Sequence, residues 1–219
     1  MNTDKNIDKE KLIEIEKEFE QGIEDVRRFN PSVTIYGSTR IDENNPNYKK
    51  VEKLAERISK ELGYSILSGG GPGIMEAANR GAFNAGGKSV GLTIRIPREQ
   101  GTNKYVNHEI PFNYFFSRQA SMSYSTEACI FCPGGFGTLS ELFEILTLKQ
   151  TKKIGDVPVI LFISSFWNPL LNTINEVLLE KFGTIDSSDL NIFIVKDDED
   201  EILEIIKNSK IRDGEDALL

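Results

Sequence analysis

The amino-acid sequence predicts an α/β fold: a single domain in which a doubly wound, mainly parallel sheet is flanked by helices. Three observations support this expectation. Short apolar runs alternate with longer amphipathic segments along the chain, which is typical of a parallel sheet covered on both faces. Several turns that follow the apolar runs contain glycine. The chain has 219 residues, 39% of them hydrophobic, which suits one domain with a buried core.

The first segment, residues 1–30, is expected to form an amphipathic helix. Its apolar residues recur at intervals of three and four, at Leu12, Ile15, Phe19, Ile23 and Val26. Pro31 follows the segment, as expected after the end of a helix.

The α/β domain is expected to occupy residues 31–210. Strands are predicted at residues 33–36, 64–67, 89–94, 128–132, 157–163 and 192–195. Helices are predicted at residues 47–62, 74–85, 118–126, 138–151, 167–182 and 199–206. Residues 95–111 have no clear period and are predicted to form a loop, and a short extended piece is expected at 112–116. Residues 211–219 are expected to be a tail, disordered from Asp213 onwards.

Composition argues against two classes of partner. The formal net charge is −8, whereas non-specific binding to nucleic acid depends on many basic residues. The longest apolar run, Val157–Ile163, is far shorter than the ~20 residues that span a bilayer. The first 29 residues are charged and lack the apolar core of a secretory signal. We therefore expect a cytoplasmic protein that binds neither nucleic acid nor membrane.

Cys129 and Cys132 form a C-x-x-C string inside an apolar run. Residues three apart on a strand point to opposite faces, so we expect two core thiols and not a redox pair. His108 is the only histidine and no second cysteine pair exists, so no metal site is expected.

Three predicted strand-to-helix turns contain glycine: Gly37-Ser38-Thr39-Arg40, Gly69–Gly73 and Gly134–Thr138. Glycine allows close approach of a ligand, and the helix start that follows directs free N–H groups at an anion. These turns lie at the carboxyl edge of the sheet, where such folds bind ligands, so a phosphate-bearing ligand is expected. The alternative is that tight turns use glycine without binding anything. Neither G-x-G-x-x-G nor a P-loop is present.

Two segments resemble the signature segments of the LOG (Lonely Guy) family of cytokinin riboside 5′-monophosphate phosphoribohydrolases, often labelled lysine decarboxylases. They are Ser68–Asn79, with sequence SGGGPGIMEAAN, and Pro133–Glu141, with sequence PGGFGTLSE. Residues 91–100 and 115–118 also resemble segments of the longer-chain branch of this family. The similarity covers roughly residues 33–195.

The resemblance implies a Rossmann-like fold, a homodimer or larger homo-oligomer, no cofactor, and a role in cytokinin biosynthesis. The substrate would be a small nucleoside 5′-monophosphate, cytokinin-like or AMP-like, hydrolysed to free base and ribose 5-phosphate. It places the catalytic pair at Arg118 and Glu141. Substrate contacts are expected from the glycine turns and their neighbours: Gly37, Ser38, Arg40, Gly70, Gly71, Asn79, Gly134, Gly135, Gly137, Thr138 and Glu144.

Glu141 would stabilise the oxocarbenium-like sugar or position the attacking water, and Arg118 would hold the phosphate or the leaving base. A structural alternative is a capping box, in which Thr138 caps the helix and Glu141 bonds back to it. The chain departs from the family at Gln119, where a lysine is usual, which removes a cation near the ligand. Arg98 replaces a more usual apolar residue and is a candidate for compensation.

Two other functions fit parts of the sequence. The same fold and turns suit a protein that binds a nucleotide or a molybdenum cofactor without turnover. A true lysine decarboxylase would need a lysine to form a Schiff base with pyridoxal phosphate, and none of the three turns contains one.

Overall fold

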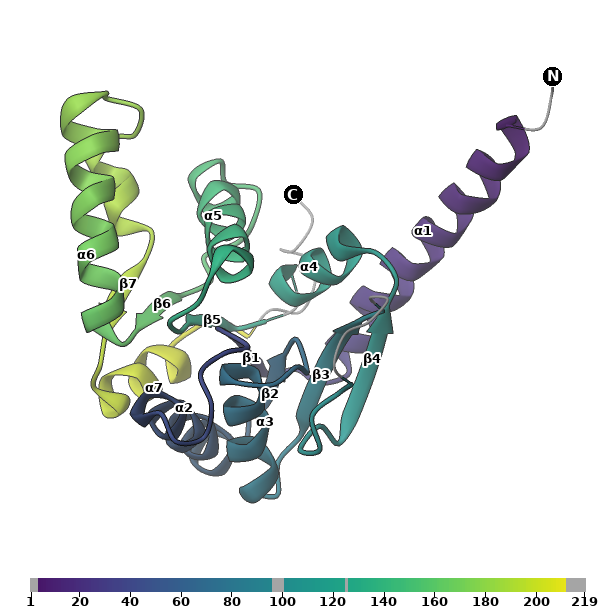
Figure 1. Ribbon diagram of the computed structural model, residues 1–219, viewed down its shortest axis with the longest axis horizontal. Coiled ribbons are helices and arrows are strands. Elements are labelled where there is room, and N and C mark those ends of the chain that lie inside the picture. Colours follow the sequence, from purple (N-terminus) through teal and green to yellow (C-terminus); the bar gives the residue numbers. More distant parts are fainter. Residues whose placement is uncertain (1–3, 96–100, 125, 212–219) are drawn as a thin grey trace.

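A parallel sheet of seven strands runs through the centre of the computed structural model, which describes residues 4–95, 101–124 and 126–211 (Figure 1). The strands are β1 (Ser32–Tyr36), β2 (Ser65–Ser68), β3 (Ser89–Ile94), β4 (His108–Phe112), β5 (Ala128–Phe131), β6 (Val159–Phe162) and β7 (Ile194–Lys196). Their spatial order is β4-β3-β2-β1-β5-β6-β7, and every neighbouring pair is parallel. The predicted α/β class and parallel sheet are confirmed. The strand order reverses between β1 and β5.

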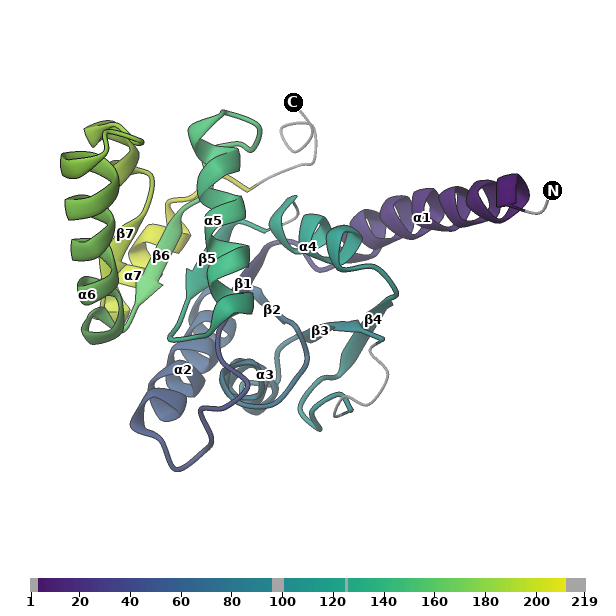
Figure 2. The ribbon, with the colours of Figure 1, turned by 45° about the horizontal axis from the view of Figure 1, so that its top comes forward.

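Helices cover both faces of this sheet (Figure 2). They are α1 (Asp4–Arg27), α2 (Pro46–Arg57), α3 (Ile74–Asn84), α4 (Phe115–Tyr124), α5 (Phe136–Gln150), α6 (Ser164–Ile174) and α7 (Glu199–Lys207). α2 and α6 continue into π-helical turns at Ile58–Leu62 and Asn175–Lys181, and a 3₁₀ turn, Ser187–Asn191, precedes β7. One apolar cluster joins α2, α3 and α7 to the sheet, and a second joins it to α1, α4, α5 and α6.

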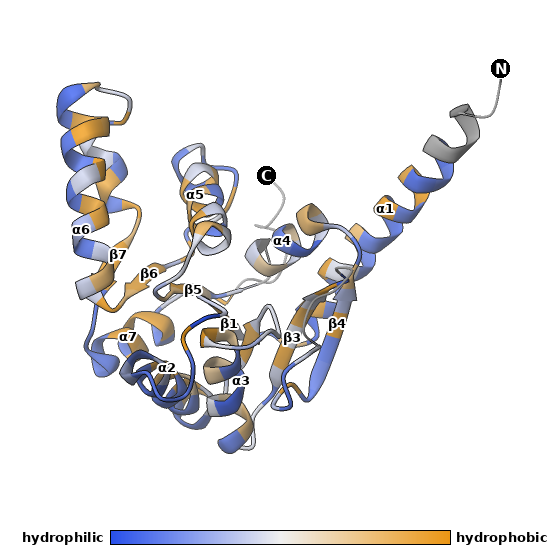
Figure 3. Cartoon of the chain, in the orientation of Figure 1, coloured by the Kyte–Doolittle hydropathy of each residue, from blue (hydrophilic) through white to orange (hydrophobic). Residues whose placement is uncertain are grey.

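The alternation of side chains along β5 divides its residues between the two clusters. Cys129 packs in the cluster under α5 and α6, and Cys132, which follows the strand, packs in the cluster under α2 and α7. Both side chains are fully buried, so the expectation of two core cysteines on opposite faces is confirmed. Figure 3 shows hydrophobic colouring on strands such as β3, β6 and β7 and mixed colouring on the helices.

Strand β4 was not expected. The sequence predicted a loop over residues 95–111 and an extended piece over 112–116, whereas residues 108–112 pair with β3 and α4 begins at Phe115. β4 is an edge strand: Ile110 and Phe112 are buried, whereas His108, Glu109 and Pro111 are exposed. Proline is tolerated at such an edge, so Pro111 does not interrupt the strand.

Helix α1 confirms the predicted N-terminal helix, but only its second half packs on the domain. Ile23 and Val26 are buried, whereas Leu12, on the same predicted stripe, is 63% exposed. The first half of α1 projects away from the sheet (Figure 1). Residues 212–219, most of the predicted tail, lie outside the described residues. No helix in the described ranges has both the length and the apolar character needed to cross a membrane.

Candidate active site

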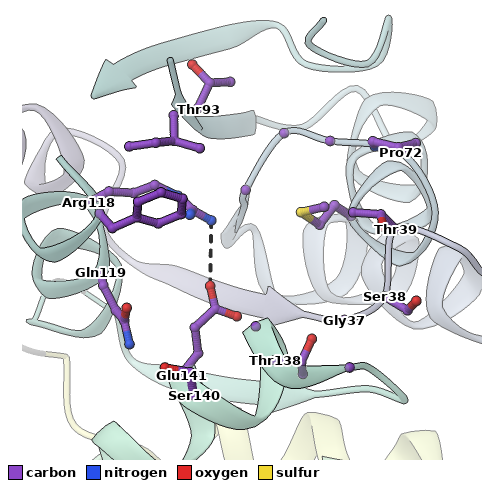
Figure 4. A pocket seen from close by; sticks show the side chains of 18 of the residues that line it. Gly37, Ser38, Thr39, Pro72, Thr93, Arg118, Gln119, Thr138, Ser140 and Glu141 are labelled. Atoms are coloured by element: carbon purple, nitrogen blue, oxygen red, sulfur yellow. Dashed lines mark ion pairs between the residues drawn. The ribbon is translucent and has the colours of Figure 1, made fainter. Parts of the chain in front are cut away.

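A large pocket opens where the strand order reverses, at the carboxyl ends of β1 and β5. Ligands of doubly wound sheets bind at this point because the loops from the two strands diverge there. The loops are held together locally, since the Ser38 N–H donates to the Pro133 carbonyl at 3.0 Å. The cavity has a volume of about 1810 Å³ (Figure 4).

Most of the predicted site residues come together in this pocket. Those that line it are Gly37, Ser38, Arg40, Gly70, Gly71, Arg118, Gly135, Gly137, Thr138 and Glu141. They come from all three glycine turns and from α4, so segments far apart in the sequence meet at one edge of the sheet.

The start of α5 forms one wall. The helix begins at Phe136, and its N-cap is Gly135, which has no side chain to bond the first amides. The first N–H groups of a helix have no partner within the helix, and they carry its positive dipole end. Added Cβ atoms at Gly135 and Gly137 would meet nothing within 4 Å, so this backbone is open to a ligand. The arrangement is suited to a phosphate.

The capping-box alternative for Thr138 and Glu141 is wrong. Because α5 begins two residues before Thr138, the threonine lies inside the first turn and cannot be the N-cap. Glu141 lies a turn further along and its carboxylate is directed at Arg118 (Figure 4).

The Gly69–Gly73 turn forms a second wall and is tied to the first. The Ile74 N–H donates to the Ser38 carbonyl at 2.9 Å. Gly73 has φ +73°, and a Cβ there would lie 2.3 Å from the same carbonyl oxygen, so only glycine allows this contact.

Arg118 and Glu141 form the charged pair at the centre of the pocket. The Arg118 Nη2 lies 3.6 Å from Glu141 Oε1, and the two side chains are 11% and 17% exposed. The Arg118 Nε donates to the Leu92 carbonyl at 2.9 Å, which holds the guanidinium at the sheet edge. A Cβ on Gly69 would lie 2.7 Å from Nη2, so the absent side chain makes room for this arginine.

Burial raises the pKa of Glu141 to about 7, although Arg118 acts in the opposite direction, and Glu144 raises it further. A carboxyl group with a pKa near neutrality exchanges protons readily at physiological pH, as a general base must. Perturbed carboxyl groups in clefts are typical of catalytic sites.

Three predicted residues lie outside the pocket lining. Gly134 packs against Thr138, because a Cβ there would lie 2.2 Å from the threonine Oγ1. Glu144 is half-buried one turn beyond Glu141, and burial raises its pKa.

Asn79 lies behind the Gly69–Gly73 turn and is fully buried. Its Oδ1 accepts hydrogen bonds from Ser68 Oγ at 2.7 Å and from Asn103 Nδ2 at 2.9 Å, and its Nδ2 donates to Ser89 Oγ at 3.0 Å. These hydrogen bonds make Asn79 a support of the turn, whose glycines line the pocket.

Two residues that the sequence did not single out line the pocket or support its lining. Arg95 follows β3, and with Arg40 and Arg118 it gives the lining three arginines among the described residues. The rule that ligands bind beyond strand ends would have found it. Asn103 Nδ2 donates to the carbonyls of Gly70 and Gly71 at 3.0 and 2.9 Å. No periodicity pointed to it, because it lies in the predicted loop.

Within the described parts of the chain, no group of three His, Cys, Asp or Glu residues could hold a metal ion. Gln119 lines the pocket beside Glu141, at the position where a lysine was expected (Figure 4). Arg98 lies outside the described residues.

Comparisons with known proteins agree with this geometry. A family model described as "Possible lysine decarboxylase" matches residues 75–206, more than half of the chain. A cytokinin riboside 5′-monophosphate phosphoribohydrolase, LOG1 of Arabidopsis thaliana, is 32% identical over 64% of this chain and 66% of its own length. The probable enzyme of the same name, LOGL6 of Oryza sativa subsp. japonica, is 31% identical over 71% of this chain and 64% of its own length. The chain thus covers just under two thirds of each of these relatives.

Among solved structures, the molybdenum cofactor binding protein of Rippkaea orientalis is similar over 81% of this chain and 95% of its own, with a TM-score of 0.59 and 22% identity. At that identity the likeness concerns the fold, which is the predicted Rossmann-like α/β fold. The match of the family model, which spans the segment from Pro133 to Glu141, and the identity to the plant proteins concern the sequence itself. The chain therefore belongs to the family described as "Possible lysine decarboxylase", the LOG family.

Proposed function

We propose that this protein hydrolyses the N-glycosidic bond of a nucleoside 5′-monophosphate, yielding the free base and ribose 5-phosphate. The observation that carries the proposal is the Arg118–Glu141 pair, 3.6 Å apart, in the same pocket as the uncapped start of α5. Two sequence relatives are named for this reaction on cytokinin riboside 5′-monophosphates. The base carried by the physiological substrate is adenine or a prenylated adenine in this proposal.

The chemistry follows from the charges in the pocket. The amides of the first turn of α5 bind the 5′-phosphate. As the C1′–N bond breaks, positive charge develops on the ribose and the leaving base takes the electron pair. The Glu141 carboxylate stabilises the ribosyl cation and accepts a proton from the water that attacks C1′. Arg118 donates to the phosphate or to the departing base, which then takes up a proton.

The direct test is to incubate the purified protein with AMP and to measure ribose 5-phosphate and adenine. We expect release by the wild type and a loss of at least about 100-fold in Glu141→Ala, since a positioned general base contributes about 10²–10⁴-fold. Thr147→Ala, an exposed position on the same helix, is the matched control and should retain activity. A panel of prenylated and unmodified monophosphates then defines the preferred base. Equal release by wild type and Glu141→Ala would contradict the proposal.

A second candidate function is a carrier that binds a nucleotide or a molybdenum cofactor without turnover. Two observations favour it: Gln119 removes a cation beside Glu141, and the fold is shared with a molybdenum cofactor binding protein. Saturable binding of AMP without any release of ribose 5-phosphate would support the carrier. Pyridoxal-dependent decarboxylation is disfavoured, because no lysine is among the described residues that line the pocket.

A further inference from the structure

A single carboxylate on α1 binds the start of α4, the helix that carries Arg118. Glu18 Oε2 accepts from the backbone N–H of Asn113 at 2.8 Å and from the Asn113 side-chain amide at 2.7 Å. Glu18 Oε1 accepts from the backbone N–H of Tyr114 at 3.0 Å and from the Ser117 hydroxyl at 2.5 Å. Asn113 and Tyr114 immediately precede the first residue of α4. Four donors at one helix start therefore converge on one residue that is distant in the sequence.

Glu18 binds the two residues that lead into α4 and the hydroxyl of Ser117 in its first turn. The start of a helix is its positive dipole end, so a carboxylate is stabilising there. Burial by itself would raise the pKa of Glu18, but the hydrogen bonds from Ser117, Asn113 and Tyr114 outweigh it and lower the pKa. The group is therefore an anion at neutral pH.

The contact between α1 and α4 is close-packed. Gly22 lies one helical turn after Glu18, so both residues are on the face of α1 that meets α4. A Cβ at Gly22 would lie 2.5 Å from the Phe112 ring and 2.8 Å from the Ser121 hydroxyl. Ser117 and Ser121 are fully buried. With no side chain at Gly22, α1 approaches closely enough for Glu18 to reach the helix start.

This contact leads directly to Arg118. The carbonyl of Tyr114, whose N–H is held by Glu18, accepts the backbone N–H of Arg118 at 3.2 Å and so closes the first turn of α4. The Arg118 side chain then reaches Leu92 at one side and Glu141 at the other. A displacement of the helix start would move the guanidinium relative to both.

We propose that Glu18 is a positioning residue: by fixing the start of α4, it holds Arg118 in register opposite Glu141 and makes the N-terminal helix part of the active site. Glu18 does not touch the pocket and acts only through Arg118. The kinetic test of this inference rests on the proposed hydrolase function, whereas the spectroscopic test described below does not.

The kinetic test is a double-mutant cycle with AMP as substrate, using wild type, Glu18→Ala, Arg118→Ala and the double variant. Misplacement of a catalytic group by about 1 Å can cost ~10²-fold, so we expect Glu18→Ala to lower kcat by about 10- to 100-fold. In the Arg118→Ala background the same change should have no further effect, because coupled residues are not additive. Glu20→Ala, at an exposed position on the same helix, should leave kcat unchanged. Additive losses, or an equal loss in Glu20→Ala, would overturn the proposal.

The second measurement needs no turnover. The Arg118 Nε–H, bonded to the Leu92 carbonyl, should give a slowly exchanging NMR signal, assigned by its loss in Arg118→Lys. We expect this signal to broaden or to exchange faster in Glu18→Ala and to a smaller extent in Glu18→Gln, which keeps the size and one acceptor oxygen. Should Glu18→Ala not fold, Glu18→Gln carries both measurements. An unchanged signal in a folded Glu18 variant would overturn the positioning role, whereas a wild type that leaves AMP intact would contradict only the proposed function.

Discussion

At the scale of single residues, Glu141 combines two properties that rarely occur together on a protein surface. Its carboxyl group is largely removed from water, yet it lies at the edge of an open pocket beside a guanidinium. The neighbouring cation offsets only part of the cost of burying the charge, so the pKa of Glu141 is raised to about 7. Glu141 is therefore mostly ionised, and able to accept a proton, above pH 7, and mostly protonated below it.

The pKa of Glu141 predicts how the proposed hydrolysis depends on pH. If Glu141 accepts a proton from water, kcat/KM should rise as the pH increases through about 7 and then level off. Arg118 lowers the pKa of Glu141, so the rising limb should move to higher pH in Arg118→Ala. The pH–rate profiles of the wild type and of Arg118→Ala measure the position of this limb. A profile that is flat between pH 5 and 9 in the wild type would argue against Glu141 as the base.

The raised pKa of Glu141 also makes the stability of the fold depend on pH. A carboxyl group whose pKa is higher in the folded state favours folding below that pKa, and this contribution is lost as the pH rises towards 7. Glu141→Gln should therefore be more stable than the wild type at pH 8, by about 1–3 kcal/mol, and similar to it at pH 5. Urea unfolding at the two pH values gives the comparison.

The sequence was informative for some site residues and uninformative for others. Glu141 and Arg118 could be placed because each lies in a short, specific motif, and both line the pocket. Asn79 lies in such a motif too, but a motif does not distinguish a ligand contact from a buried support. Asn103 bonds the same glycine turn. It lies in no recognised motif, and its partners are more than 30 residues away in the sequence, in the turn that follows β2.

At the scale of elements, α5 shows how two glycines of one motif serve different purposes. Gly134 has no room for a side chain, since a Cβ would press against Thr138, whereas Gly137 faces open space inside the first helical turn. Gly134 thus permits packing, and Gly137 leaves the amides accessible.

Alanine at these two positions should separate stability from binding. Gly134→Ala should destabilise the fold by about 1–3 kcal/mol through overpacking. Gly137→Ala should stabilise the helix by up to about 1 kcal/mol, yet weaken AMP binding because its methyl group enters the pocket. Thermal unfolding and titration calorimetry measure the two effects. Weaker folding of Gly137→Ala, or unchanged affinity for AMP, would contradict this assignment.

Helices and strands with a clear hydrophobic pattern could be predicted from the sequence. A strand that is recognisable only from its pairing with a neighbour could not. Buried strands such as β5 and β6 consist of apolar residues throughout, so their short apolar runs were enough to predict them. β4 is recognised only once β3 lies beside it, because its exposed residues are the polar His108 and Glu109 and the strand-disfavouring Pro111. The start of α5 was also predicted two residues too late. The prediction placed it at Thr138, a residue type that often caps helices, whereas the helix begins at Phe136 after Gly135.

At the scale of the whole molecule, large apolar side chains are exposed on α4 and α5. Phe115, Phe116, Phe136 and Phe143 are 58%, 52%, 94% and 41% exposed. Phe115 and Phe136 also line the pocket. Clustered exposed aromatic residues are typical of protein interfaces.

We predict that a homodimer or larger assembly covers this face. Light scattering after size exclusion should give a mass of at least twice the 24.6 kDa of one chain. Phe143→Ser, on α5 outside the pocket lining, should shift the assembly towards the monomer, whereas Phe182→Ser, which is 64% exposed beyond α6, should not. A monomeric wild type at micromolar concentration would refute the assembly.

The central position of β1 determines when a binding site first exists during synthesis. β1 is the first strand of this sheet to be synthesised, but one of its two neighbours, β5, which pairs Ala128 with Val33, is synthesised much later. Until that strand and the start of α5 have emerged, one edge of β1 has no partner strand and the pocket lacks a wall. A ligand of this pocket can therefore stabilise the chain only after residues up to 141 have left the ribosome, so it would influence the late steps of folding and not the early ones.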